Sequence, residues 1–299
     1  MNTVKIIFNA IEWQKVLYLM FVILLTKYCF LYGFGYDTTL SIIDIILFAL
    51  TCGFFYKATF LLSYYFKSNS KALKIYKPAI KYTAFIFISI GVLLGVFLSI
   101  KINQPHFLFI ILICGFLAIV YSRFAKEKSF LNNIIKSFLL PFAIFCVFFL
   151  DTPINLTVKE WETFLNLQFI TIIYLILTFI DALHQENLKD FSTIKEDNAN
   201  NLKTLPILFG RKRAKDVSYI LVIFIGILIV YLTVSFITIS FLFKTFLFLN
   251  IAPYLVTTYF FFKAKTAKDY IQLLKISKYI SVIGILGILA IAYYFKYVA

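Results

Sequence analysis

The sequence is poor in charge, cysteine and histidine. Of its 299 residues, 14% are charged, four are Cys and two are His. The mean hydropathy of +0.92 excludes an ordinary soluble globular domain. The four cysteines lie in apolar stretches without C-x-x-C spacing, which excludes a disulfide framework and a cysteine metal site. The shortage of charge therefore indicates a membrane protein.

The remaining residues form long apolar runs, each near the ~20 residues that a bilayer-crossing helix needs. We expect an all-α, polytopic membrane helix bundle with about nine transmembrane helices in a single domain, residues 1–299. No low-complexity linker or second domain boundary is visible. The expected spans are residues 16–36, 40–65, 80–100, 104–121, 134–151, 164–184, 218–238, 239–262 and 279–297.

The distribution of Lys and Arg predicts the orientation. Most of these 29 residues lie in the N-terminal segment and in the loops after spans two, four, six and eight, which share one side of the membrane. By the positive-inside rule that side is cytoplasmic, and the C-terminus lies outside the cell membrane. The net charge of +15 then reflects topology and attraction to anionic lipid or phosphate, and no nucleic-acid-binding motif accompanies it.

One polar stretch, residues 185–214, follows the sixth span. On a continuous helix Glu186, Asp190, Thr193 and Asp197 lie within about 60° of one another. Oxygen donors on one face suit a hard divalent cation such as Mg²⁺. The alternative is a solvated helix face beside a membrane.

The residues that follow are more specific: Asn201-x-x-Thr204-Leu205-Pro206, then Gly210. Together with Glu186, Asp190 and Asp197, this run resembles the second aspartate-rich motif of the UbiA superfamily of intramembrane prenyltransferases. Thr193 stands where the family has its middle Asp. Asn201 replaces a glycine, a tolerable change because Asn also enters the left-handed backbone region.

The family's first aspartate-rich motif has no counterpart here. It belongs at the end of span two, but no Asp or Glu occurs between Asp44 and Glu127. One ungapped alignment puts Lys67 and Lys71 at aspartate positions. An ammonium group neutralises phosphate directly, so Lys67, Lys71 or Lys57 is a candidate to replace part of a missing metal's role. The alternative is ordinary positive-inside charge with loss of activity.

A second resemblance follows span four. Tyr121-Ser122-Arg123-Phe124-Ala125-Lys126 resembles the family's Y-S-x-x-x-K segment, whose Lys helps to receive the diphosphate, and Asn133 comes a turn or two later. The resemblance implies diphosphate binding by Arg123, Lys126 and Asn133, together with Lys67 and Lys71.

Three further ionisable residues, Lys27, Asp44 and Lys57, lie inside the expected spans. Such a group is a functional candidate by default, although near a span end it can reach the interface.

The resemblance implies a prenyltransferase that moves an isoprenyl group from a polyprenyl diphosphate to an acceptor that the sequence does not identify. The implied catalytic residues are Asp190, Asp197 and Lys126. Glu186, Asp190 and Asp197 are the implied metal ligands, for one Mg²⁺ ion where the family holds two. The alternative is a non-catalytic UbiA-like protein that binds or presents an isoprenoid or another lipid.

Overall fold

The computed structural model describes residues 13–31, 35–67, 77–127, 129–199, 201–235, 253 and 255–297. The chain forms two compact units, each of which is described by itself. Unit 1 contains Met1–Lys27 and Asp37–Ile154, and unit 2 contains Tyr28–Tyr36 and Asn155–Ala299. Whether the two units act as one domain stays a prediction.

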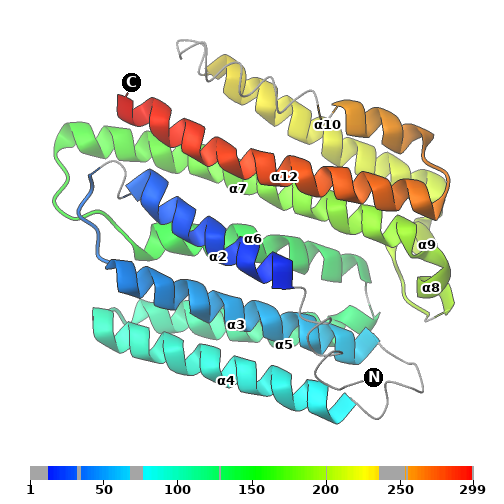
Figure 1. The fold of residues 1–299 in the computed structure, drawn as a ribbon, viewed down its shortest axis with the longest axis horizontal. Coiled ribbons are helices and arrows are strands. Elements are labelled where there is room, and N and C mark those ends of the chain that lie inside the picture. Colours follow the sequence, from blue (N-terminus) through cyan, green and yellow to red (C-terminus); the bar gives the residue numbers. More distant parts are fainter. Residues whose placement is uncertain are drawn as a thin grey trace. The chain divides into compact units, whose positions relative to one another are not determined.

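Unit 1 is a bundle of antiparallel helices (Figure 1). The central helix α3 packs against α2, α4 and α5, and α6 packs against α2 and α5. At its C-terminal end, α2 passes into a π-helical turn, η1 (Lys27–Leu31). The helices of unit 1 are α2 (Trp13–Thr26), α3 (Ile42–Lys67), α4 (Lys77–Ile102), α5 (His106–Glu127) and α6 (Ser129–Leu150).

Unit 2 is organised around the long helix α7, which packs against α10 and α12. Two short helices, α8 and α9, connect α7 to α10, and residues 255–263 are helical before α12 begins. The helices of unit 2 are α7 (Val158–Ser192), α8 (Ile194–Ala199), α9 (Leu205–Phe209), α10 (Arg211–Ser235) and α12 (Ala267–Tyr297).

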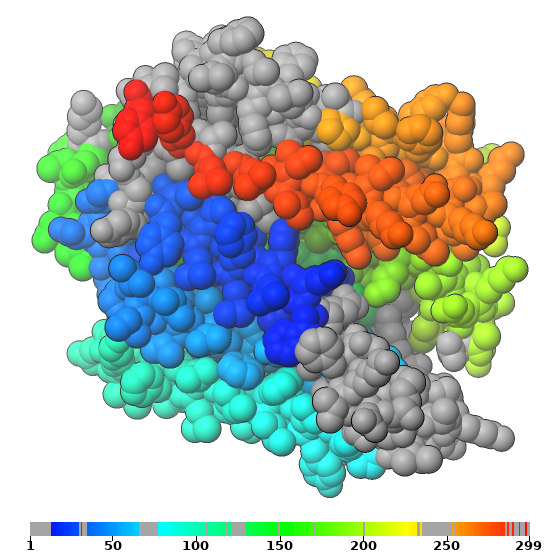
Figure 2. Space-filling model, viewed as in Figure 1, coloured from blue at the N-terminus to red at the C-terminus, as the bar shows by residue number. Residues whose placement is uncertain are grey.

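The structure confirms an all-α membrane protein. Within the described residues, five helices are long and apolar enough to cross a membrane. Large apolar side chains are exposed along α4, among them Leu93, Phe97 and Ile100, and α4 is the cyan helix at the edge of unit 1 (Figure 2). This is the surface expected of a lipid-facing helix. The count of nine spans stays a prediction, because most of residues 239–262 lie outside the described ranges.

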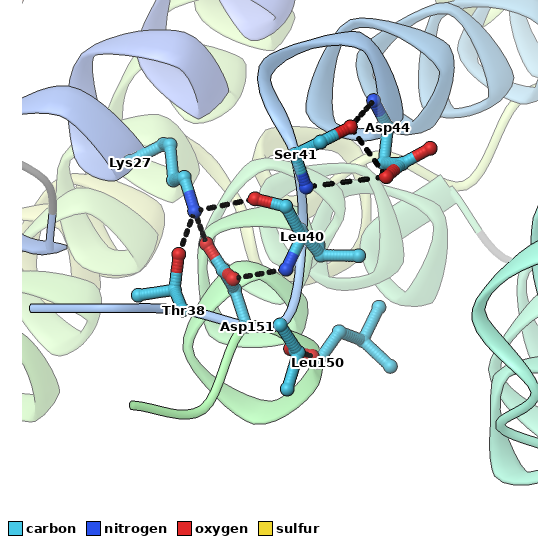
Figure 3. A network of polar contacts seen from close by, with 8 residues as sticks. Lys27, Thr38, Leu40, Ser41, Asp44, Leu150 and Asp151 are labelled. Carbon is cyan, nitrogen blue, oxygen red and sulfur yellow. Dashed lines mark hydrogen bonds and ion pairs between the residues drawn. The ribbon is translucent and has the colours of Figure 1, made fainter. Parts of the chain in front are cut away.

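Two ion pairs connect the helices at one end of unit 1. Lys27 is buried and donates to the carboxylate of Asp151, to Thr38 Oγ1 and to the Leu40 carbonyl (Figure 3). The second oxygen of Asp151 accepts a 2.9 Å hydrogen bond from the Leu40 N–H. These contacts tie the segment before α3 to the end of α6, so Lys27 has a structural explanation.

Asp44 belongs to the second pair. It accepts from the Ser41 hydroxyl at 2.6 Å, and Lys101 Nζ lies 2.5 Å from its other oxygen. Ser41 precedes the first residue of α3 and Asp44 is its third, so the two form a capping box. The ion pair of Asp44 with Lys101 therefore connects α3 to α4.

Candidate functional site

The candidate site begins with two buried carboxylates at the C-terminal end of α7. Glu186 is 8% exposed and Asp190 is 6% exposed. They lie one helical turn apart and therefore share a face. A 35-residue helix is about 52 Å long, which exceeds the ~30 Å hydrocarbon core of a bilayer. The last turns of α7 can therefore carry polar groups at the edge of that core.

The turn before these carboxylates is fixed to α12 by a polar network. Gln185 Nε2 donates to Asp181 Oδ2 at 3.0 Å and to Ser281 Oγ at 2.6 Å. The Ser281 hydroxyl in turn donates to the same oxygen of Asp181. Since all three residues belong to unit 2, the network fixes the rotation of α7 about its axis, and with it the direction of the Glu186–Asp190 face.

The sequence predicted one continuous helix that carries all the acidic residues, and this prediction is wrong at Thr193. The helix α7 ends at Ser192, Thr193 is its C-cap, and α8 begins at Ile194. The Thr193 Oγ1 lies 3.1 Å from the Lys189 carbonyl and 2.7 Å from Asp197 Oδ2. A threonine hydroxyl competes with backbone N–H groups for helix carbonyls. At this residue one helix ends and the next begins. Asp197 therefore belongs to a different helix from Glu186 and Asp190.

The end of α8 confirms the interpretation of Asn201. Its φ is +54°, which lies in the left-handed region that Asn tolerates. The Asn201 N–H donates to the Asn198 carbonyl at 3.1 Å, and the Leu202 N–H donates to the Asp197 carbonyl at 2.9 Å. These two bonds form a Schellman motif, which ends α8 and turns the chain towards α9.

The Thr204-Leu205-Pro206 run forms the start of α9. Thr204 is its N-cap and Pro206 lies in its first turn, where the missing N–H of proline costs nothing. Gly210 separates α9 from α10 with φ of +79° and ψ of 157°, a combination that residues with a Cβ rarely adopt. The side chains of Thr204, Leu205 and Pro206 are buried, so this part of the motif packs the α7–α10 connection.

The oxygen donors of α7 fit Mg²⁺ in its usual protein form. Within the described parts of the chain, no three His, Cys, Asp or Glu side chains form a group that could hold a metal ion. Mg²⁺, however, commonly takes one or two carboxylates and fills its other positions with water and substrate phosphate. The pair Glu186 and Asp190 supplies that number of carboxylates, and Asp197 as a third ligand stays a prediction.

The predicted cationic residues belong to unit 1. Arg123 and Lys126 lie in the last turns of α5, and Lys67 is the last residue of α3, but the structure does not describe their side chains, and Lys71 lies outside the described residues. Asn133 is buried on α6. Their predicted roles in diphosphate binding stay predictions.

The ammonium group of Lys57 lies among aromatic rings of unit 1. Its ammonium nitrogen lies 3.8 Å from the centre of the Trp13 ring and within 6 Å of the Phe54 and Phe87 ring centres. Cation–π attraction of this kind stabilises a partly buried ammonium group without a nearby anion. This contact favours a structural role for Lys57.

The sequence analysis missed Lys136 and Asn132 on α6. Lys136 is 8% exposed and Asn132 is 1% exposed, although both lie near the start of an apolar helix. The signal was present, because a Lys four residues after an Asn places two polar groups on one helix face.

Comparisons with known proteins agree with this architecture. The UbiA prenyltransferase family matches residues 79–279. Digeranylgeranylglyceryl phosphate synthase of Methanosphaera stadtmanae is 28% identical over 152 residues, which are 51% of this chain and 48% of that relative. The alignment thus spans about half the length of the curated relative.

Two solved structures have a similar fold. One, from a study of digeranylgeranylglyceryl phosphate synthase in membranes, matches with a TM-score of 0.69 and 16% identity, and covers 98% of this chain and 99% of that chain. The other is a UbiA homologue from Archaeoglobus fulgidus bound to GPP and Mg²⁺. It matches with a TM-score of 0.56 and 16% identity over 93% of this chain and 97% of that chain. At this identity the likeness shows the fold.

Proposed function

Since this chain belongs to the UbiA prenyltransferase family, we propose that it transfers an isoprenyl group from an allylic diphosphate to an acceptor. The reaction takes place at the cytoplasmic side of the cell membrane, with the N-terminus cytoplasmic and the C-terminus outside. The apolar tail of the donor lies among the membrane-spanning helices, and its charged end lies near the C-terminal end of α7. Prenyl transfer is the activity that the family's name describes.

In the proposed reaction the bond between the allylic carbon and the diphosphate oxygen breaks, and its electron pair leaves with the diphosphate. A nucleophilic atom of the acceptor forms the new bond to that carbon, and the acceptor loses a proton. Glu186 and Asp190 would hold Mg²⁺, with Asp197 as a third ligand. When bound, this ion would supply positive charge that stabilises the departing diphosphate. Lys126 and Arg123 donate hydrogen bonds to the phosphate groups.

The observation that carries the proposal is the burial of Glu186 and Asp190 directly before the α8–α9 connection. One or two carboxylates on one helix face are a donor set that Mg²⁺ commonly takes in proteins. Asn201 and Gly210, which the motif places at its two glycine positions, adopt the positive φ angles that the connection needs. The burial of the two carboxylates and the backbone geometry of the connection therefore both support the proposal that this stretch is the second aspartate-rich motif.

The proposal is tested with purified protein in lipid nanodiscs, a labelled polyprenyl diphosphate and a panel of acceptors. We expect Mg²⁺-dependent release of diphosphate, lowered on the order of 100-fold in Asp190→Asn. Glu196→Gln is the matched control, because Glu196 is an exposed acid on α8, and it should retain activity. Equal turnover in EDTA and in Mg²⁺, or full activity of Asp190→Asn, would contradict the proposal.

The second candidate function is the binding or presentation of an isoprenoid or another lipid without catalysis. The missing first aspartate-rich motif favours it, because the family's second metal then lacks carboxylate ligands. The same experiment separates the two functions. Saturable binding of the labelled diphosphate without its release, for every acceptor tested, supports the carrier.

A further inference from the structure

Helix α10 of unit 2 carries an exposed apolar stripe. Large apolar side chains along one face of this helix are exposed: Val217, Ile220, Phe224, Ile227 and Tyr231. On a helix all of them lie within about 40° of the direction of Arg213, which is also exposed. An exposed apolar stripe along a membrane-length helix is the surface that lipid acyl chains cover. Arg213 therefore lies in line with the lipid-facing side of α10.

The position of Arg213 along α10 corresponds to the phosphate layer of a bilayer. It precedes Val217, the first residue of the stripe, by four residues, which is about 6 Å along the helix axis. The polar headgroup region adds roughly 5–8 Å on each side of the hydrocarbon core. With the apolar stripe in that core, Arg213 and the neighbouring exposed Lys212 lie at headgroup depth.

The next cation, Lys215, has different surroundings. Its ammonium nitrogen lies 2.6 Å from the Ala264 carbonyl oxygen and 3.3 Å from the Phe261 carbonyl oxygen. Lys215 therefore connects α10 to the segment before α12, and Arg213 lies about 160° away from it around the helix. The only acid between residues 205 and 220 is Asp216. The exposed cations at residues 211–213 outnumber it, so this surface has an excess of positive charge.

Two exposed apolar side chains precede these cations. Leu208 is 50% exposed and Phe209 is 54% exposed, whereas Leu205 and Pro206 of the same short helix are buried. Gly210, with φ of +79° and ψ of 157°, changes the direction of the chain between α9 and α10. The helix α9 therefore does not continue the axis of α10 into water. Leucine and phenylalanine beside basic residues are typical of a segment that lies in the membrane interface.

We propose that this surface, residues 208–213, binds an anionic phospholipid of the surrounding membrane. The lipid phosphate accepts hydrogen bonds from Arg213 and Lys212, and the acyl chains lie against Leu208 and Phe209. A guanidinium group matches the geometry of a phosphate, and each cation near an anionic membrane surface strengthens the attraction. A lipid bound here fixes the end of the α8–α9 connection at the membrane surface. The proposal does not depend on prenyl transfer.

The test measures which lipid contacts a tryptophan placed in α9. Phe209→Trp is reconstituted in nanodiscs with equal amounts of phosphatidylglycerol and phosphatidylcholine, and only one of the two lipids carries brominated acyl chains. Bromine quenches tryptophan fluorescence on contact, and the signal of the unchanged protein, from Trp13 and Trp161, is subtracted. We expect both brominated lipids to quench the added tryptophan, with phosphatidylglycerol preferred about tenfold.

The cations are tested in the Phe209→Trp protein. Addition of both Lys212→Gln and Arg213→Gln should make the two lipids quench about equally. Arg213→Gln alone should lower the preference several-fold, which keeps the test decisive if the double substitution folds poorly. Lys195→Gln is the matched control, because Lys195 is an exposed lysine of the same unit that lies on α8, away from the stripe. It should leave the preference unchanged.

Three results would overturn the proposal. Without quenching by either lipid, α9 lies outside the bilayer. Equal quenching before any cation is removed, or a preference that survives both substitutions, excludes a role of these cations in lipid selection. A preference that inorganic diphosphate abolishes assigns the cations to a soluble phosphate ligand instead. Because no turnover is measured, the result is independent of whether the chain transfers prenyl groups.

Discussion

The two ends of unit 1 hold their buried polar groups in different ways. At one end Lys27 and Asp151 satisfy each other completely, with further bonds to Thr38 and Leu40. At the other end of the same helices, roughly 18 Å along α2, Lys15 and Lys136 approach one ring. There the protein leaves the hydroxyl of Ser137 unbonded.

The difference separates polar groups that bond one another within the fold from a buried hydroxyl, that of Ser137, which has no hydrogen-bond partner. A closed network gains nothing from a bound molecule, because every donor and acceptor is already used. A buried hydroxyl without a partner costs free energy in the folded protein. The comparison predicts that loss of a polar group lowers stability strongly at the Lys27–Asp151 end and little at Ser137.

The largest expected effect is the loss of Lys27. Lys27→Met leaves the fully buried carboxylate of Asp151 without its cation, so the free energy of unfolding should fall by about 3–5 kcal/mol. Ser137→Ala should cost clearly less or even stabilise the fold, because the buried hydroxyl that it removes has no hydrogen-bond partner. Thermal unfolding in nanodiscs, followed by circular dichroism, compares the two variants.

The double variant Lys27→Met/Asp151→Leu is the control for this prediction. It removes both charges and should recover much of the lost stability, since a buried ion pair often contributes no more than apolar groups of similar size. An equal loss of stability from Lys27→Met and Ser137→Ala would break the distinction between the two ends of unit 1.

A smaller effect is expected at the closed connection between α8 and α9. Asn201→Ala forces a residue with a Cβ and no local hydrogen-bonding group into a positive φ angle, which should cost about 1 kcal/mol. Asn201→Gly should be neutral or stabilising. Urea unfolding of the two variants checks this order, and a more stable Ala variant would contradict it.

The smallest effect is expected at the start of α12, where a closed network is exposed to water. The Asp269 carboxylate accepts hydrogen bonds from the Thr266 and Lys265 backbone N–H groups, which hold its pKa below the usual range. Because the folded pKa is lowered, this stabilisation is present above the ordinary Asp pKa and is lost as the pH falls through the folded value.

Hydrogen exchange at the first turn of α12 measures this effect. Protection should fall between neutral pH and pH values below the ordinary Asp pKa of about 3.9. Asp269→Asn should lower protection at neutral pH and remove most of its pH dependence. The change should be modest, since water competes for the same bonds. A pH dependence unchanged in Asp269→Asn would exclude Asp269 as its source.

Much of the fold was predictable because it follows from local sequence. Apolar runs of membrane length predicted the helices from α2 to α7. Most of the predicted helix ends lie within several residues of the observed ones. Asn201 was correctly placed in the left-handed region, because its position in the motif demanded a residue that tolerates that conformation. The candidate site was less predictable, since the assumption of one continuous helix failed at Thr193, where a side-chain hydroxyl competes with the backbone.

By itself, the sequence determined the class of protein, the membrane-length helices and the acidic stretch before Thr204-Leu205-Pro206. Composition and periodicity are local properties of the sequence, so they can be read directly from it. Only the tertiary structure decided that Lys27 meets Asp151, 124 residues away, and that Lys136 is buried beside Phe60. Such contacts depend on how helices pack, and packing joins residues whose separation along the chain carries no local signal.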